Sequence, residues 1–330
     1  MEILVTGPDG VLGSNLVREL LKRNYKVSVL LEPNKDPITL AGLDIKRYYG
    51  DILDASIIDD AIKGKDVVFH CAASTSVFPP RNKNVVRVNV EGTKNVIQAA
   101  LKHSIKRLIY VGSAASFGSG DSEQNSGNEE NPYTNAIAGL DYLDSKYEAQ
   151  QLIIEATKKQ KLPAIVVNPT FMIGPYDSKP SSGAMVIAIH KRKIPGHTVG
   201  IKNFVAVKDV AFAMANAINM GRIGECYILG NDNLSYKEAF SKIARVASVK
   251  GPRWNLPKPL VLSFGRINSM LGTLFHYSPG MTKELCKFSC ENHYFSSEKA
   301  RKELLLPHTP IEVAIKECYD WFKNNGYLDK

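Results

Sequence analysis

Hydrophobic positions in the first half of the chain follow two alternating patterns. Short runs rich in β-branched residues, typical of buried strands, are separated by longer stretches with apolar residues at helical spacing. This alternation predicts a parallel sheet covered by helices. The predicted strands are residues 2–6, 26–31, 45–49, 66–70, 107–112 and 164–168, and the predicted helices are residues 12–23, 54–62, 85–103 and 140–158.

The second half of the chain differs, because the alternation stops after Asn168 and Gly and Pro become frequent. We expect an α/β domain with a doubly wound parallel sheet over residues 1–168, to which residues 203–230 return. Residues 169–202 and 231–330 are expected to form a smaller, mostly helical substrate subdomain. In this half the predicted strands are residues 204–207 and 225–229, and the predicted helices are residues 236–247, 260–274, 281–290 and 310–324.

Two stretches of the chain need separate interpretation. The apolar run at residues 260–275 is shorter than a bilayer span and contains Arg266 and Asn268. We expect it to be a core or substrate-pocket helix, and we expect no contact with a membrane. A polar stretch at residues 119–135 is too long for an ordinary connection, which suggests either an active-site lid or a plain surface loop.

Composition narrows the class of protein. Of the 330 residues, 44% are hydrophobic and 23% are charged, which is typical of a folded globular protein and excludes disordered and collagen-like chains. Five cysteines form no paired framework and no signal peptide is recognisable, so we expect a cytoplasmic protein. The net charge of +9 is dispersed in short clusters, which favours solvated surfaces over a nucleic-acid partner. Cys286 and Cys290 lack further ligands at suitable spacing, so we expect no metal site.

A glycine-rich turn follows the first predicted strand and leads directly into a helix. It reads Thr6-Gly7-Pro8-Asp9-Gly10-Val11-Leu12-Gly13. Gly7 allows a tight turn, Gly10 lets the backbone approach a pyrophosphate, and Gly13 allows the helix to pack closely on the strand. The phosphates would meet the positive end of the helix. This context predicts a Rossmann-type site for a nicotinamide dinucleotide.

Residues after the next strands indicate how the rest of the dinucleotide would bind. Glu32 follows the second strand, where a carboxylate can accept both adenosine ribose hydroxyls and repels a 2′-phosphate. NAD is therefore slightly favoured over NADP, although Lys35 lies close enough to bind a phosphate. Asp51 can accept the adenine amino group, and Ile52 can cover the ring. The small residues expected beside the cofactor after the fourth strand, as packing residues rather than nucleophiles, are Cys71, Ala72 and Ala73.

Three residues form a candidate catalytic group. Tyr142 and Lys146 are four residues apart on one face of a predicted helix, and Ser113 follows the fifth predicted strand. A tyrosine hydroxyl, with an ordinary pKa of about 10, needs nearby positive charge to act near neutrality, and a lysine ammonium supplies that charge. Ser113 would hold a substrate oxygen against the Tyr142 hydroxyl.

Further motifs lie between and beyond these groups. They are Asn89-Val90-Glu91-Gly92-Thr93-Lys94-Asn95, residues 167–175, residues 203–210, residues 296–301 and Trp321-Phe322. The first of these, with Asn168-Pro169-Thr170, the glycine-rich turn, Asp51-Ile52, Cys71-Ala72-Ala73 and the candidate catalytic group, occurs in the order seen in extended short-chain dehydrogenases/reductases. The resemblance covers essentially the whole chain. The other motifs resemble most the dihydroflavonol reductase-like branch of the NAD-dependent epimerase/dehydratase superfamily, which also includes hopanoid-associated sugar-epimerase-like proteins.

The resemblance implies a Rossmann fold and assigns catalysis to the candidate group of three. It implies that Asn89 orients the end of the fourth strand beside the cofactor, and that Pro169 and Thr170 line the nicotinamide end. A homodimer formed through the helices at residues 85–103 and 140–158 is also implied. The residues expected to bind NAD(H) or NADP(H) are Thr6, Gly7, Asp9, Gly10, Val11, Leu12, Gly13, Glu32, Asp51, Ile52, Cys71, Ala72, Ala73, Asn89, Tyr142, Lys146, Pro169 and Thr170.

Several positions depart from the patterns of this superfamily. Reductases of the branch commonly carry Arg near the end of the second strand for NADP, where this chain has Glu32. The usual Tyr-Gly that closes the serine loop is Phe117-Gly118, so any substrate contact from that hydroxyl is lost. Sugar dehydratases typically place an acidic pair just after the serine. This chain has Ala114 and Ala115 there, which argues against dehydration.

The leading interpretation is a reductase that moves hydride from NAD(P)H to an aldehyde or ketone while Tyr142 donates the proton. The alternative is a nucleotide-sugar epimerase with tightly held NAD. A third hypothesis is a non-catalytic cofactor-binding protein, against which the complete catalytic group argues. The small carbonyl or alcohol substrate would bind between residues 171–193, 119–135 and 260–275. Cationic candidates for binding a sugar diphosphate are Lys179, Lys191, Arg192, Lys193 and Arg253.

Overall fold

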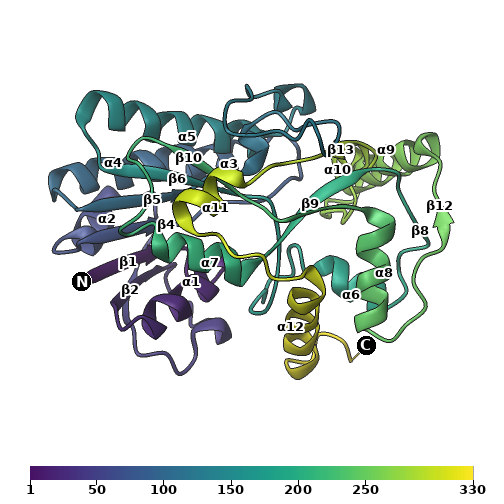
Figure 1. The fold of residues 1–330 in the computed structure, drawn as a ribbon, viewed down its shortest axis with the longest axis horizontal. Helices are drawn as coiled ribbons and strands as arrows, with labels where there is room; N and C mark the ends of the chain where they lie inside the picture. The colour runs from purple at the N-terminus through teal and green to yellow at the C-terminus, as the bar shows by residue number, and fades with distance from the viewer. Residues whose placement is uncertain (330) are drawn as a thin grey trace.

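A seven-stranded parallel sheet forms the centre of the molecule (Figure 1). The computed structural model describes residues 1–329. In spatial order the strands are β10 (Cys226–Leu229), β6 (Ala164–Pro169), β5 (Arg107–Val111), β4 (Val67–His70), β1 (Glu2–Thr6), β2 (Lys26–Leu31) and β3 (Lys46–Tyr49). The chain winds outward from β1, first through β2 and β3 and then through β4 to β10. The expected doubly wound α/β fold is therefore confirmed.

Helices cover both faces of this sheet and complete two apolar cores. On β1, the side chains of Ile3 and Val5 belong to one core and that of Leu4 to the other, as the alternation of a strand requires. The helices are α1 (Val11–Lys22) and α7 (Val207–Asn216) on the first face, and α2 (Ala55–Ile62), α4 (Gly92–Lys102) and α5 (Asp141–Gln160) on the second.

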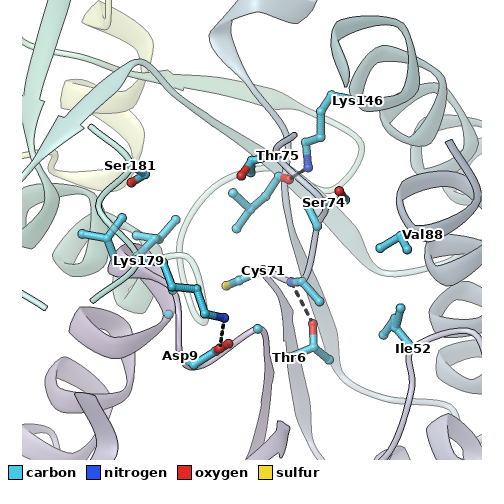
Figure 2. A pocket seen from close by; sticks show the side chains of 18 of the residues that line it. Thr6, Asp9, Ile52, Cys71, Ser74, Thr75, Val88, Lys146, Lys179 and Ser181 are labelled. Carbon is cyan, nitrogen blue, oxygen red and sulfur yellow. Dashed lines mark hydrogen bonds and ion pairs between the residues drawn. The ribbon is translucent and has the colours of Figure 1, made fainter. Parts of the chain in front are cut away.

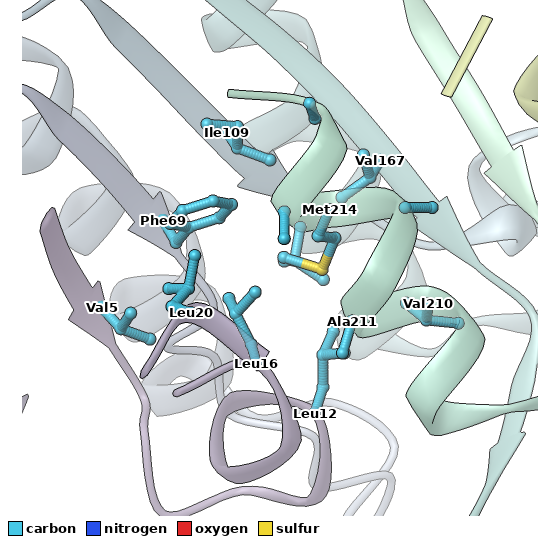
Figure 3. Packing of buried hydrophobic residues seen from close by; sticks show 14 of the residues in the cluster. Val5, Leu12, Leu16, Leu20, Phe69, Ile109, Val167, Val210, Ala211 and Met214 are labelled. Atoms are coloured by element: carbon cyan, nitrogen blue, oxygen red, sulfur yellow. The ribbon is translucent and has the colours of Figure 1, made fainter. Parts of the chain in front are cut away.

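The core on the first face anchors the beginning of α1 (Figure 3). Leu16 and Leu20 of α1 and Met214 of α7 are fully buried against Phe69 and Ile109 of the sheet. Complete burial of a side chain of this size contributes about 1.5–3 kcal/mol relative to leaving it in water. Because α1 is held in this way, the turn between β1 and α1 has a fixed position at the end of the sheet.

The helix expected at residues 85–103 changes geometry along its length. It begins as α3 (Lys83–Val86), passes through a π-helical turn at Arg87–Glu91, and continues as α4. A π turn inserts one residue into the helical repeat and therefore redirects the side chains that precede it. Asn89 lies in this turn and is buried.

A second sheet lies beyond the carboxyl ends of the main strands. Of the segment 203–230 that was expected to return to the main sheet, β10 does so and β9 (Ile201–Ala206) does not. The outer edge of β6 is taken by β10, so β9 pairs elsewhere. Its partners are β7 (Phe171–Ile173), β11 (Asp232–Ser235) and β13 (Asn292–His293). The helices around this sheet are α6 (Ala184–His190), α8 (Tyr236–Val246) and α12 (Ile311–Asn324).

The remaining elements are short except for one helix. They are the strand pair β8 (Gly196–His197) and β12 (Trp254–Asn255), the helices α9 (Lys258–Leu274), α10 (Lys283–Phe288) and α11 (Glu298–Leu304), and 3₁₀ turns at Ile38–Leu40, Ala114–Ser116 and Asn135–Ala138.

Helix α9 is not the core or pocket helix that its apolar sequence predicted. It packs on α10 through Val261 and Gly265, Gly272 lies against Phe78 and Pro279, and most of its other side chains are exposed. A periodic apolar face predicts a helix but does not specify what covers that face. Within residues 1–329, no helix combines the length and the apolar character that crossing a membrane requires.

The polar stretch at residues 119–135 is fastened at several points. The backbone N–H groups of Gly120 and Gly127 donate to the Tyr294 carbonyl at 2.9 and 3.0 Å. A carboxylate oxygen of Glu129 accepts a 2.7 Å hydrogen bond from the N–H of Ile228, on the edge strand β10. The stretch therefore covers the free edge of the main sheet, where an unpaired strand would otherwise face solvent.

Candidate active site

A cavity of about 840 Å³ opens at the carboxyl ends of β1, β4 and β5. The strand order reverses between β1 and β4, and ligands of open α/β sheets bind in the crevice at such a point. The wall of the cavity contains Ser113 and all but one of the residues expected to bind a dinucleotide. The exception is Asn89.

The glycine-rich turn has room for phosphates but not for side chains. Gly7 has a φ of +63°, and a Cβ there would lie 2.7 Å from the backbone of Ala72. A Cβ on Gly13 would collide with the carbonyl oxygen of Gly7. A Cβ on Gly10 would have that oxygen as its nearest neighbour, at 3.8 Å, and would occupy part of the cavity. The first turn of α1 has no side-chain cap and no acidic residue, so its free N–H groups carry partial positive charge. These features fit the pyrophosphate of a dinucleotide.

The side chains expected at the adenosine end lie at the rim of the cavity. The carboxylate of Glu32 is largely exposed and forms an ion pair with Lys35. Asp51 Oδ1 accepts a 2.9 Å hydrogen bond from the N–H of Leu53, which holds the turn after β3. Its second oxygen makes no hydrogen bond within the described chain and can accept from an adenine amino group. Ile52 is buried beneath this position.

A neutral histidine supports the end of β4. His70 Nδ1 lies 2.9 Å from Thr6 Oγ1, and Nε2 lies 3.0 Å from Thr93 Oγ1. Burial lowers the pKa of His70 to about 3. Thr6 Oγ1 also accepts a 3.2 Å hydrogen bond from the N–H of Ala72 (Figure 2). Burial raises the pKa of the neighbouring Cys71 thiol to about 12, which suits packing and not nucleophilic attack.

Ser113, Tyr142 and Lys146 meet at the end of β5. Ser113 follows the strand, while Tyr142 and Lys146 lie one turn apart on α5, and all three line the cavity. Burial raises the pKa of Tyr142 above its ordinary value, and a hydrogen bond to Ser113 opposes that shift in part. The tyrosine is therefore protonated at neutral pH. It can donate its proton to an oxygen that Ser113 also holds.

Lys146 is a buried ammonium without an acidic partner. Its Nζ donates a 2.5 Å hydrogen bond to the Val111 carbonyl and lies 4.7 Å from the centre of the Tyr110 ring. Burial lowers the pKa of Lys146 to about 8, and no carboxylate of residues 1–329 forms an ion pair with it. Figure 2 shows its side chain reaching down beside Ser74 and Thr75. Its charge is therefore free to act on Tyr142 and on the ribose of a bound dinucleotide.

Asn89 acts behind the cavity wall. Its Oδ1 accepts a 2.7 Å hydrogen bond from the N–H of Ser74, and its Nδ2 donates to the Ser74 carbonyl at 3.0 Å and to Ser145 Oγ at 2.9 Å. These bonds join the segment after β4 to the helix that carries Tyr142. These bonds place Asn89 as a positioning residue that does not line the cavity, and its direct contact with the cofactor stays a prediction.

The cavity wall also contains Asn84, Arg87 and Val88, from α3 and the π turn, which the sequence analysis did not select. Asn84, Arg87 and Val88 could have been found from the sequence because they lie just before the Asn89 motif. On the other side the wall contains Asp177, Ser178, Lys179, Ser181 and Ser182, from the segment 171–193 that was expected to bind the substrate. Part of that segment therefore does line the cavity, and within it Lys179 was also a candidate for binding a sugar diphosphate. The other four cationic candidates, the stretch 119–135 and the run 260–275 contribute nothing to the wall.

Lys179 joins the two sides of the cavity. Its Nζ donates to the Asp9 carboxylate in the glycine-rich turn at 2.9 Å, as Figure 2 shows. Both residues line the cavity. The ion pair therefore bridges the region in which the pyrophosphate would lie.

Lys202 on β9 is a further ammonium without an acidic partner. Its Nζ lies 4.6 Å from the centre of the Phe171 ring, which lines the cavity, and His293 is its neighbour in strand register. Burial lowers the pKa of Lys202 to about 8 and, with the charge of Lys202, lowers that of His293 to about 4. An anionic group on a ligand would satisfy this lysine. No pattern in the sequence indicated Lys202, because its apolar surroundings come from distant segments.

Comparison with known proteins agrees with this geometry. Residues 3–230 match the model of the NAD dependent epimerase/dehydratase family. A Synechocystis sp. protein provisionally named as a dihydroflavonol 4-reductase is 31% identical and covers 98% of this chain and 95% of its own. Sterol demethylase protein B of Methylococcus capsulatus is 28% identical, and the match covers 99% of this chain and 100% of that protein. The crystal structure of gox2253 is 32% identical, covers 98% of both chains and has a TM-score of 0.84. The chain therefore belongs to the NAD dependent epimerase/dehydratase family of extended short-chain dehydrogenases/reductases.

Proposed function

We propose that this protein is an NAD(P)-dependent oxidoreductase that reduces an aldehyde or ketone. The observation that carries the proposal is the meeting of Ser113, Tyr142 and Lys146 on one wall of a cavity whose other end is built for a dinucleotide. When bound there, the reduced nicotinamide supplies a hydride. The protein must then supply a proton to the carbonyl oxygen, and Tyr142 holds one at neutral pH.

Each residue of the group has a distinct task in this proposal. The Ser113 hydroxyl donates to the substrate oxygen and aligns it with the Tyr142 hydroxyl. Tyr142 transfers its proton to that oxygen as negative charge develops there. Lys146 stabilises the phenolate that remains, because its ammonium is desolvated and no carboxylate neutralises it.

The residues after Ser113 support reduction over dehydration. Ala114 and Ala115 form a 3₁₀ turn and carry no group able to move a second proton. Phe117 packs into the core beside α5, so this position contributes no hydroxyl to the substrate. Tyr142 therefore remains the proton donor for the substrate oxygen, which is what reduction needs.

We propose NAD(H) as the preferred cofactor. The Glu32 carboxylate at the rim would accept the ribose hydroxyls and repel a 2′-phosphate. Lys35, paired with Glu32, reduces this preference by neutralising part of the charge. Parallel titrations with NADH and NADPH test the assignment, and tighter binding of NADPH would contradict it.

The experiment that tests the proposed reaction is Tyr142→Phe. Removing the hydroxyl should lower kcat for carbonyl reduction by about 10²- to 10⁴-fold, while NADH affinity changes little. Tyr147→Phe on the same helix is the matched control, because Tyr147 stacks on Tyr133 and lies outside the cavity wall. Full activity of Tyr142→Phe would remove the basis of the mechanism.

A nucleotide-sugar epimerase is the second candidate, favoured by one observation. Lys202 lies beside the cavity without an acidic partner in the described chain, as a site for a diphosphate would require. Denaturing the purified protein and measuring released dinucleotide separates the two candidates, because an epimerase that recycles NAD in place retains it in near-stoichiometric amount. Lys202→Met should weaken binding of a nucleoside diphosphate if the epimerase is correct and leave kcat/KM for an uncharged carbonyl unchanged if it is not.

A further inference from the structure

The exposed apolar side chains of this protein are concentrated in one segment. Among residues 1–329, eighteen large hydrophobic residues are exposed, and nine of them lie in the stretch from Trp254 to Met281. These nine are 38–76% exposed, and five of them belong to α9. The nine residues, which we call the α9 face, are Trp254, Leu260, Phe264, Ile267, Met270, Leu274, Phe275, Tyr277 and Met281.

The α9 face is one side of an amphipathic helix whose other side is already used. Leu260, Phe264, Ile267 and Leu274 recur at helical spacing and form a stripe. The packed side of the helix is set by Gly265, where a Cβ would lie only 2.8 Å from the Cys286 side chain on α10. The stripe is therefore directed away from the protein, and α9 lies at the end of the molecule opposite β2 (Figure 1).

The stretch of chain that carries the α9 face has charges of a single sign. The 45 residues from Ala239 to Lys283 contain seven Lys or Arg and no Asp or Glu, so they carry seven of the net nine positive charges. Six of these cations are exposed and make no ion pair within residues 1–329, whereas Lys242 pairs with Glu312. The six are Arg245, Lys250, Arg253, Lys258, Arg266 and Lys283. An apolar stripe flanked by unpaired cations is suited to an anionic lipid surface.

We propose that the protein docks on an anionic membrane surface through the α9 face. The stripe would enter the boundary between headgroups and acyl chains, and the flanking cations would contact lipid phosphates. A second copy of the chain fits less well, because the unpaired cations that flank the two faces would repel one another. The expectation of no membrane contact rested on the lack of a spanning segment, which does not bear on surface docking.

The position of α9 determines which part of the protein would lie close to the membrane. Gly272 of α9 lies against Phe78, in the segment that continues from Ser74 and Thr75 of the cavity wall. Docking would therefore bring the segment that borders the cavity close to the lipid surface. The proposal does not depend on which reaction the cavity performs.

Flotation with vesicles tests the proposal. The full-length protein should float with vesicles that contain phosphatidylglycerol and bind vesicles of phosphatidylcholine alone at least about tenfold more weakly. Added salt should weaken the binding. Trp254 is exposed in the α9 face, so its fluorescence should shift to shorter wavelength when the unmodified protein binds. If the unmodified protein neither floats nor shows this shift, the proposal is wrong.

Two variants separate the apolar and charged contributions. Replacing both Phe264 and Ile267 by Ser should lower binding by about tenfold or more, since their apolar area no longer leaves water. Lys258→Gln with Arg266→Gln should lower binding to the anionic vesicles about fivefold per charge. Ile38→Ser is the matched control, because Ile38 is exposed outside the α9 face. NADH binding checks that each variant is folded.

Two results would overturn the assignment. Binding by the Phe264 and Ile267 double variant equal to that of Ile38→Ser would exclude the α9 face as the contact. A dimer in lipid-free solution that the same double variant converts to monomer would show that a second copy covers the face.

Discussion

Lys146 in the cavity wall and Phe264 in the α9 face have opposite solvent environments. In the cavity wall, a charged lysine is buried and its ammonium bonds a backbone carbonyl. In the α9 face, an aromatic ring is exposed with unpaired cations around it. The first region places polar groups where water is scarce, and the second places apolar groups in water.

The difference shows that side chains around the cavity have their bonding partners inside the protein, whereas the α9 face has none within residues 1–329. Around the cavity, the polar side chains hold one another, as the bonds from Asn89 to Ser74 and Ser145 illustrate. A site of this kind is prepared before its ligand arrives, so little reorganisation accompanies reaction. The α9 face has no internal partner of this kind. Its side chains are explained by a contact outside the chain.

The largest expected effect comes from the same substitution made in both regions. Leu16 is fully buried in the core under the glycine-rich turn, whereas Leu274 is 65% exposed. Leu16→Ala should lower the free energy of unfolding by about 2–5 kcal/mol, because a cavity forms in a close-packed core. Leu274→Ala should change it by less than about 0.5 kcal/mol. Urea denaturation of the two variants measures both values. Equal losses would mean that the α9 face is buried in solution.

The same contrast explains which parts of the fold could be predicted from the sequence. The main strands were predicted to within one or two residues, since buried runs such as Val67–His70 have a clear composition. The strands β8, β12 and β13 were missed because two residues show no periodicity. Helix α9 was predicted at the correct place, but its environment was not. Apolar periodicity is the same for a helix buried in a core and for one that faces outward.

Residues of the site could be predicted from the sequence where their position relative to a main strand is fixed. Tyr142, Lys146 and the glycine-rich turn have fixed positions relative to strands with strong signals, so their convergence at the cavity could be expected. The segment 171–193 was expected to contribute to the pocket, and part of it does line the cavity. The position of Lys202 could not be expected, because it depends on how the second sheet packs on the first. No local pattern contains that information, because it arises from tertiary contacts between distant segments.

A smaller effect should appear in the pH dependence of dinucleotide binding. With its pKa lowered to about 8, Lys146 is charged below pH 8 and neutral above it. We expect NADH affinity to be highest below pH 8 and to fall as the pH rises through 8, as fluorescence titration would measure. Tyr142 keeps its proton throughout this range, so Tyr142→Phe should show the same pH dependence.

Stability provides an independent check on the same lysine, with the opposite sign. In the unfolded chain Lys146 keeps its proton up to a pKa of 10.5, whereas in the folded chain it loses the proton near pH 8. Burial of the ammonium therefore opposes folding below pH 8, and this opposition is relieved between pH 8 and 10.5. Lys146→Met should be more stable than the unmodified protein at pH 7, and the difference should shrink by pH 10. A constant difference would place Lys146 in a more solvated position.

The smallest expected effect concerns the ion pair between Lys179 and Asp9. Lys179 is exposed, so Lys179→Ala should change the free energy of unfolding by less than about 1 kcal/mol. It should nevertheless raise the rate of NADH release several-fold in stopped-flow displacement, because the pair bridges the cavity, and Lys191→Ala outside the wall serves as the control. Asp9→Asn separates two causes. If the pair itself retains the dinucleotide, Asp9→Asn speeds release as Lys179→Ala does. If Lys179 instead binds phosphate, removing the competing carboxylate frees the lysine for that contact and slows release.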